Sequence, residues 1–446
     1  MAGNDFLFQR PTFVSSHNTL AKFVARPVLR FIDREVAGGV LLLLATAAAL
    51  IWANSPWSES YHDFWHTQID LTVGSWHLHE LDVGEFVNDA LMAVFFFVVG
   101  LEIKRELVTG ALNSVRAAAL PAIAAVGGMA APALLFFMLN TSGEASRGWG
   151  IPMATDIAFA VGVVALLGAR VAPALKLFLL TLAIVDDIGA IGVIAVFYTD
   201  DLDFVWLALT VAGLLLVRIL QRIRVWAIPV YAVVGMFIWY ATLESGVHAT
   251  IAGVALGLLT PARPLLSERD AQSIVDSLPD DANVAEVRHA NFLVKESVPL
   301  TERLENALHP FTAFLIIPIF ALANAGIELS GDKISDAASS NVTLGIMLGL
   351  VVGKPLGITV FTWIATRFGF DLPEGINWRQ FIGMGFAAGI GFTVSIFVSG
   401  LAYDDPSITD LSKIGILGAS MLAAVFALVT LRMSCRAHEE EPVGAA

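Results

Sequence analysis

The feature that most constrains this chain is a series of apolar runs long enough to cross a lipid bilayer. About 18 apolar residues suffice to span the hydrocarbon core as a helix. Several runs contain Gly or Pro, which spanning helices tolerate because their neighbours satisfy the freed backbone groups. We therefore expect an all-α integral membrane protein with about twelve transmembrane helices in a single domain, residues 37–435. The predicted spans are 37–54, 86–103, 117–139, 150–168, 174–198, 203–220, 226–242, 246–260, 310–328, 342–365, 380–402 and 412–434.

Composition agrees with a membrane protein and excludes several other classes. Hydrophobic residues make up 57% of the chain and charged residues only 15%, whereas about a quarter of the residues are charged in ordinary soluble domains. The single cysteine, Cys435, excludes an internal disulfide. The net charge of −14 comes without a basic stripe, so nothing indicates nucleic-acid binding. The first run follows 36 ordinary residues, which is unlike a signal peptide. Nothing indicates a bound cofactor.

The distribution of Lys and Arg predicts the orientation of the chain in the membrane. Cytoplasmic loops collect basic residues, and with twelve spans 22 of the 26 fall on the side that also holds both termini. Three fall on the other side, and Lys354 lies inside the tenth span. We therefore expect a bacterial inner-membrane protein with a cytoplasmic N-terminal segment, 1–36, and a cytoplasmic tail, 436–446.

A segment on the outer side, residues 64–84, has the pattern of a β-hairpin. Thr67–Val73 and Trp76–Leu81 alternate apolar and polar residues around the two-residue turn Gly74–Ser75. A lone hairpin is only marginally stable in water. We therefore expect this one to pair with a second copy and to form a homodimer.

Two adjacent aspartates lie in the middle of the fifth span. Asp186 and Asp187 occupy the centre of Leu182–Ala190, where a charged side chain costs about 2.5–3.5 kcal/mol on insertion scales. Neighbouring helical residues point about 100° apart, so each carboxylate can meet a different partner. Two close carboxylates resist ionising together, and hard cations such as sodium prefer oxygen ligands. Protons and cations therefore compete for one site, which is the chemistry of antiport.

Two spans are interrupted near their centres, in opposite halves of the chain. Pro152, Thr155 and Asp156 interrupt the fourth span, and Gly389–Thr393 interrupts the eleventh. Paired interruptions of this kind indicate a transport site, because half-helices present charged ends inside the membrane. Asp156 is expected to balance the positive ends and Lys354 the negative ones. Lys354 also needs an aspartate of the fifth span as partner, and the sequence leaves open which one.

Together with three further segments, these motifs resemble the NhaA family of bacterial sodium/proton antiporters. The additional matches are Asn88–Phe97 with Gly100–Glu102, Ser245–Thr250 and Phe320–Gly326, and they occur in the family's order over most of the chain. The resemblance implies inverted repeats with two crossed broken helices, spans four and eleven. The family is itself an established example of that architecture.

The resemblance also implies an electrogenic, pH-regulated exchange of sodium or lithium for protons by a secondary active transporter, not an enzyme. Asp187 and Asp186 would carry cation and proton, with Thr155, Asp156 and Lys354 supporting the site. The outer hairpin would form the dimer contact. The positions that match the family's pH-responsive groups are Glu102, Arg105, Glu106, His248 and Glu305.

One segment departs from the family pattern. The cytoplasmic loop 261–309, which includes Ser267–Asp281, is longer than the family leads one to expect, and this puts a detailed transfer of pH regulation in doubt. Within it, Val284–Leu308 alternates charged and apolar residues and is predicted to form one surface helix.

Four other functions fit the residues less well. An intramembrane aspartyl protease places its aspartates on separate helices, one in a Gly-x-Gly-Asp context that this chain lacks. A cation channel needs no site at which protons compete, and a carrier of organic anions would not hold adjacent aspartates, which repel anions. A metal site could involve the outer histidines, but no cysteine supports one, and we interpret them as solvated: His62, His66, His77 and His79.

Overall fold

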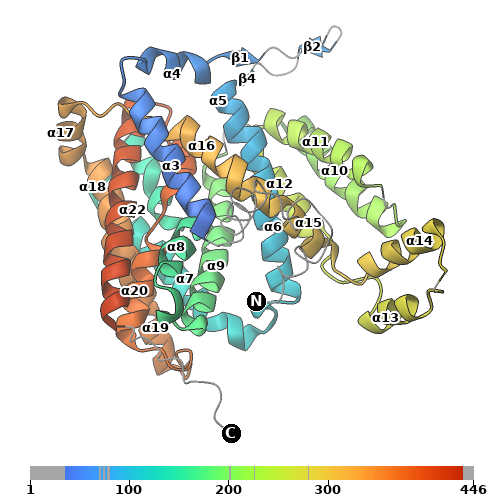
Figure 1. The fold of residues 1–446 in the computed structure, drawn as a ribbon. Coiled ribbons are helices and arrows are strands. Elements are labelled where there is room, and N and C mark those ends of the chain that lie inside the picture. The colour runs from blue at the N-terminus through green and yellow to red at the C-terminus, as the bar shows by residue number, and fades with distance from the viewer. Residues whose placement is uncertain are drawn as a thin grey trace, which may run out of the picture.

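The computed structural model shows a helical bundle with a small strand pair at one end (Figure 1). It describes residues 36–69, 72–73, 76–77, 81–199, 202–225, 227–279 and 281–434. The predicted terminal segments 1–36 and 436–446 lie outside the described residues, apart from Val36. Within the described residues, seven helices are long and apolar enough to cross a membrane, or up to ten if each of three bent pairs counts as one span.

Residues 36–259 include the first eight segments that were predicted to span the membrane. The α-helices α11 and α12 are apolar but shorter than the seven helices that are long enough to cross a membrane. The elements are α3 (Val36–Ala53), α4 (Ser58–Trp65), α5 (Val83–Phe86), η3 (Val87–Leu91), α6 (Met92–Val108), η4 (Ala111–Asn113), α7 (Val115–Leu139), η5 (Glu144–Met153), α8 (Ile157–Ala165), η6 (Gly168–Arg170), α9 (Pro173–Phe197), α10 (Phe204–Arg222), α11 (Ile228–Glu244) and α12 (Thr250–Leu259).

Residues 268–434 include two helices outside the bundle and the last four segments that were predicted to span the membrane. η7 and η8, like η3 earlier in the chain, are π-helical turns inside otherwise α-helical segments. The elements are α13 (Glu268–Asp276), α14 (Val284–Lys295), α15 (Leu300–Phe311), η7 (Thr312–Ile316), α16 (Ile317–Asn324), α17 (Gly331–Ser339), α18 (Asn341–Leu348), η8 (Gly349–Gly353), α19 (Lys354–Arg367), α20 (Trp378–Ala388), α21 (Phe392–Ala402) and α22 (Pro406–Ser434).

The predicted hairpin forms two short antiparallel ladders. Strand β1 (Gln68–Ile69) pairs with β4 (Leu81–Asp82), and β2 (Thr72–Val73) pairs with β3 (Trp76–His77). The predicted turn Gly74–Ser75 lies outside the described residues. The strands lie beyond the end of the bundle, next to α4 (Figure 1).

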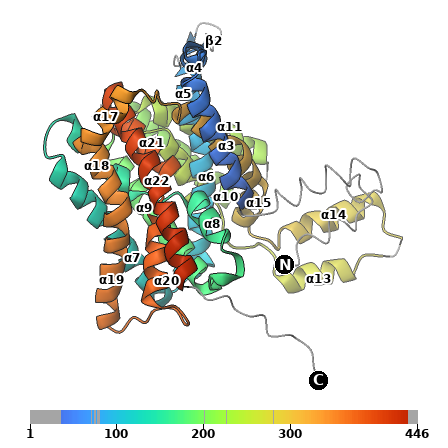
Figure 2. The ribbon, with the colours of Figure 1, turned by 60° about the vertical axis from the view of Figure 1, so that its left-hand side comes forward.

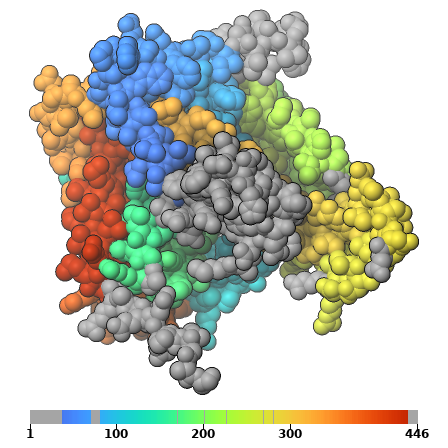
Figure 3. Space-filling model, viewed as in Figure 1, coloured from blue at the N-terminus to red at the C-terminus, as the bar shows by residue number. Residues whose placement is uncertain are grey.

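The loop 261–309 differs from its prediction. Val284–Leu308 does not form one helix: α14 ends at Lys295, and α15 begins at Leu300 and continues into the next span as far as Asn324. The break precedes Pro299, which disfavours a helical conformation at the residue before it. The α13–α14 pair projects from the bundle as a separate lobe, coloured yellow in the space-filling view (Figures 2 and 3).

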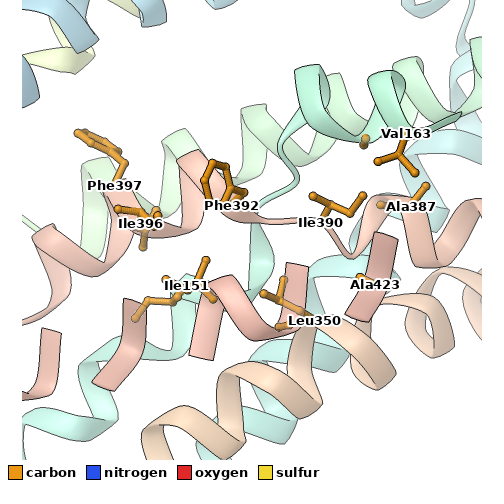
Figure 4. Close-up of a cluster of buried hydrophobic side chains, with 14 of the residues drawn as sticks. Ile151, Val163, Leu350, Ala387, Ile390, Phe392, Ile396, Phe397 and Ala423 are labelled. Atoms are coloured by element: carbon orange, nitrogen blue, oxygen red, sulfur yellow. The ribbon is translucent and has the colours of Figure 1, made fainter. Parts of the chain in front are cut away.

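The interrupted spans meet in a closely packed apolar core. Ile151 of η5, Leu350 of η8 and Ile390 of the break between α20 and α21 are fully buried in one cluster. Phe392 and Ile396 continue it along α21 (Figure 4). This packing holds the breaks in the interior of the bundle, where a polar backbone group must find a partner within the protein.

Two glycines let α7 and α19 approach closely, one turn from Lys354. A Cβ on Gly357 would meet the carbonyl oxygen of Gly127, and a Cβ on Gly127 would meet that of Gly357. Gly357→Ala is therefore expected to push the helices apart and to lower the free energy of unfolding by about 1–3 kcal/mol. Gly192→Ala is the control, because a Cβ there meets no atom within 4 Å. Thermal unfolding in detergent checks this, and equal melting temperatures for the two variants would contradict it.

Candidate functional site

The two interrupted helices contact each other at their breaks. η5 and α8 are bent by 42° around residues 154–156, and α20 and α21 are bent by 46° around residues 389–391. The backbone N–H of Asp156 donates to the carbonyl oxygen of Ile390 at 2.7 Å. The Thr155 hydroxyl donates to the carbonyl oxygen of Ala388 at 2.9 Å. Each break thus satisfies part of the other's exposed backbone.

Asp156 places its carboxylate at the N-termini of two half-helices. Its Oδ1 accepts the Phe159 N–H at 2.9 Å and caps α8. Its Oδ2 accepts both the backbone N–H of Thr393 at 3.1 Å and the Thr393 hydroxyl at 2.5 Å, in the first turn of α21. The carboxylate is 2% exposed. A negative charge is stabilised where two positive helix ends converge, so this position suits an ionised carboxylate.

Lys354 joins the end of one half-helix to the fifth span. Its Nζ lies 2.9 Å from Oδ2 of Asp186 and also donates to the carbonyl oxygen of Met153, the last residue of η5. Lys354 and Asp186 are both completely buried. The sequence left the partner of Lys354 open, and the structure pairs it with Asp186.

The neighbouring Asp187 has a different environment. Asp186 also accepts a hydrogen bond from the Thr155 hydroxyl at 2.8 Å on Oδ2, whereas Asp187 makes no hydrogen bond or ion pair within the part of the chain that the structure describes. Oδ1 of each residue is buried and has no hydrogen-bond partner among the described residues. Two oxygens on adjacent residues are therefore free to hold a proton or a cation.

The charges of this site do not balance within the protein. Asp156, Asp186 and Asp187 bring three carboxylates into the interior, and of these three Lys354 forms an ion pair with Asp186 alone. A buried charge without compensation is costly. When all three carboxylates are ionised, the site gains stability by taking up protons or a cation, and its oxygen-only ligands suit a hard cation.

Four of the five residues matched to pH response lie together, and one lies apart. Arg105 donates to Oε1 of Glu305 at 2.7 Å and lies 3.6 Å from Oε1 of Glu106. Glu102 is three residues before Arg105 on α6, on the same side of the helix. His248 instead contacts the carbonyl oxygen of Tyr198, with its Nε2 at 2.5 Å. Tyr198 follows the last residue of α9, so His248 is not part of the Arg105 cluster.

Polar contacts also link η5 to the ends of α9 and α21. The Tyr198 hydroxyl donates to the carbonyl oxygen of Arg147 at 2.7 Å and accepts the Gly150 N–H at 3.2 Å. Arg147 pairs with Asp404 at 3.2 Å, and Oε1 of Glu144 accepts the backbone N–H of Asp404 at 2.7 Å. These contacts connect η5 to the C-terminal ends of α9 and α21.

Sequence reasoning assigned no role to Thr393 or Tyr198, although both make contacts that shape the site. Thr393 was noted only as the last residue of the second interruption. Thr393 is the second residue of α21 and not its N-cap, so the usual sequence signal of a helix start does not mark it. Nothing local marks Tyr198, because its partners lie about fifty residues away in the chain.

The outer histidines have carboxylate neighbours. His62 Nε2 lies 3.7 Å from Glu328, and His66 Nδ1 lies 2.9 Å from Asp82. Within the described residues no group of three or more His, Cys, Asp or Glu side chains is arranged to hold a metal ion. His79 lies outside the described residues.

Comparisons with known proteins find relatives over nearly the whole chain. Residues 29–431 match the family described as Na+/H+ antiporter 1. The chain is 46% identical over 429 residues to the Na+/H+ antiporter NhaA 3 of Frankia alni, covering 94% of this chain and 92% of the relative. It is 45% identical over 413 residues to the Na+/H+ antiporter NhaA of a Janthinobacterium species, covering 90% and 91%. It is 45% identical over 411 residues to that of Rhodopirellula baltica, covering 90% and 92%.

Proposed function

The chain belongs to the NhaA family of Na+/H+ antiporters, and from that premise we propose that it exchanges sodium or lithium ions for protons at Asp186 and Asp187. Members of the family are multi-pass membrane transporters rather than enzymes. The observation that carries the proposal is the pair of adjacent buried aspartates, each with an unpartnered Oδ1. Only one of the two is neutralised by Lys354.

In the proposed cycle, Asp187 binds the cation and Asp186 contributes a second oxygen. Protons entering from the outside displace sodium, and the reloaded site then opens to the inside by alternating access. When a cation binds, Asp186 leaves Lys354, and Lys354 releases its proton. When the cation leaves, Lys354 takes up a proton and pairs with Asp186 again. Exchange of two protons, on Asp187 and Lys354, for one cation makes the cycle electrogenic. Thr155 holds Asp186, and Asp156 balances the half-helix ends throughout.

The proposed topology follows the charge distribution. Twelve spans place both termini in the cytoplasm of a bacterial inner membrane, as the segregation of Lys and Arg supports. The ten membrane-capable helices or bent pairs and the two shorter helices α11 and α12 supply these spans. Spans three to five and ten to twelve, each centred on a broken helix, form the proposed inverted repeats.

We place the pH response in the Arg105 cluster, the contact group of Arg105, Glu106 and Glu305 with the adjacent Glu102. Its residues join α6 to α15 through the 2.7 Å ion pair between Arg105 and Glu305. Loss of the negative charge on Glu305 would weaken the ion pair that connects α6 to α15. His248 acts separately, through its contact with the backbone at the end of α9.

The hairpin 64–84 is the proposed dimer contact. Its paired strands extend beyond the bundle, and exposed strand edges readily pair with a second chain. Replacement of residues 68–82 by a short Gly-Ser linker is expected to convert the purified protein from a dimer into a monomer. Light scattering coupled to size-exclusion chromatography measures this, with a variant lacking residues 438–446 as the control. A shortened-hairpin protein that remains dimeric would refute the contact.

Proton flux in reconstituted vesicles tests the proposed function. Vesicles with a preset acid interior receive sodium, lithium or potassium in turn, and the internal pH is followed over external pH 6.5 to 9. We expect sodium and lithium, but not potassium, to make the interior alkaline. A membrane potential that develops with the flux would support electrogenic exchange. If no cation produces a response at any pH, the proposed substrate is wrong.

A further inference from the structure

An apolar groove lies between α19 and α20, away from the ion site. It has a volume of about 390 Å³ and is lined by Thr359, Val360, Trp363, Trp378 and Ile382. Trp363 is 48% exposed, so the groove opens on the surface of the bundle. Because the walls are apolar and lie on membrane-spanning helices, the groove suits a hydrocarbon chain.

Two arginines lie at one end of this groove. Arg367 follows Trp363 by one helical turn, and its guanidinium lies 4.9 Å from the centre of the Trp363 ring. Arg379 precedes Ile382 by three residues and therefore shares its face of α20. Both arginines are exposed, and neither forms an ion pair with a carboxylate of the residues that the structure describes.

The position of these side chains corresponds to the boundary between lipid tails and headgroups. α19 ends at Arg367 and α20 begins at Trp378, so both arginines and Trp378 lie at the same end of their spans. Tryptophans concentrate at this level of a membrane, and basic pockets between spanning helices bind anionic headgroups. Arginine is also well suited to phosphate, because its planar fork can donate two parallel hydrogen bonds.

We propose that this groove binds one anionic phospholipid, with an acyl chain between α19 and α20 and the phosphate between Arg367 and Arg379. The bound lipid braces two elements of the ion site. α19 begins at Lys354, and α20 ends at Ala388, whose carbonyl oxygen accepts the hydrogen bond of Thr155. Binding of the lipid is therefore expected to stabilise the folded protein, and the groove is expected to prefer anionic lipids to neutral ones.

Lipid retention by the delipidated full-length protein tests the proposal. Native mass spectrometry in detergent compares added phosphatidylglycerol with phosphatidylcholine of the same chain length. We expect wild type to retain phosphatidylglycerol preferentially and to melt at a higher temperature with it. Arg367→Gln with Arg379→Gln should weaken that binding about 30-fold, because each arginine near the headgroups contributes about a factor of five.

The control removes two charges elsewhere. Arg218 and Arg222 are exposed on α10, on the other side of the bundle from α19 and α20 (Figure 1). Arg218→Gln with Arg222→Gln should leave the preference of the α19–α20 groove intact. If both double variants lose the preference for phosphatidylglycerol to the same extent, the preference is a general charge effect and the proposed site is wrong. If inorganic phosphate alone stabilises the protein as much as the lipid does, the proposal that an acyl chain occupies the groove is wrong.

A second measurement does not depend on the arginine variants. Phosphatidylglycerol with brominated acyl chains quenches tryptophans that it touches, and Trp363 and Trp378 line the groove. Quenching should be stronger than with brominated phosphatidylcholine, and Trp363→Phe with Trp378→Phe should remove that difference. If both lipids quench equally in wild type, the groove does not select an anionic lipid.

Discussion

Asp187→Asn is expected to reduce sodium-driven proton flux to the background of empty vesicles while the protein remains folded. The amide has the shape of the carboxylate, but it carries no negative charge for a cation and does not take up or release a proton near neutral pH. Within the described residues Asp187 makes no hydrogen bond or ion pair that the change would break. The melting temperature should therefore stay the same or rise, since an uncompensated buried charge is removed.

Two comparisons make this result specific. Asp332→Asn, at an exposed position of α17, should leave the flux unchanged. Asp186→Asn should lower the melting temperature, because Lys354 then loses the carboxylate 2.9 Å from its Nζ. The same substitution at adjacent positions should thus lower the melting temperature at Asp186 but not at Asp187. Sodium-driven flux by Asp187→Asn at the wild-type rate would refute the assigned role.

Lys354→Ala is expected to lower the free energy of unfolding by about 3–5 kcal/mol and to shift the pH profile of transport. Removing one partner of a buried ion pair leaves the other as an uncompensated charge, and here Asp186 is completely buried. The substitution also leaves the Met153 carbonyl oxygen without the Lys354 donor. Unfolding in detergent gives the stability, and vesicle flux against pH gives the profile.

A double variant separates the ion pair from the loss of side-chain packing. If the charge of Asp186 causes the damage, Lys354→Ala with Asp186→Asn should recover part of the stability that Lys354→Ala loses. The non-additivity of the two changes measures the coupling between the residues. Additive effects, with no recovery, would mean that packing alone explains the loss and that the ion pair contributes little.

Much of this arrangement could be predicted from the sequence, because charged residues, which are costly to place inside a membrane, stand out within apolar runs. Asp186, Asp187 and Lys354 are mid-span charges, and each lies in the interior cluster. The interruptions were visible as Pro152 and as the glycines before Thr393. The contacts between the two breaks follow from backbone groups that must be satisfied away from water.

The remaining details depend on distances that sequence patterns do not contain. The choice of Asp186 over Asp187 as partner of Lys354 depends on how α9 is rotated relative to α19, and adjacent residues differ there by about 100°. The alternation of charged and apolar residues continues across the break between α14 and α15, and only Pro299 marks it in the sequence. The separation of His248 from the Arg105 cluster reflects depth along the spans, which family matching alone does not reveal.

The π-helical turn η8 affects how the tenth span would respond to a change in length. η8 covers Gly349–Gly353 and ends directly before Lys354. A π-turn accommodates one residue more than the α-helix around it needs, whereas removing a residue from a regular α-helix rotates everything after it by about 100°. Deletion of one residue within η8 would therefore convert the π-turn into a regular α-helical turn, and Lys354 would still face Asp186. A deletion between Lys354 and Gly357 would instead rotate Gly357 away from α7.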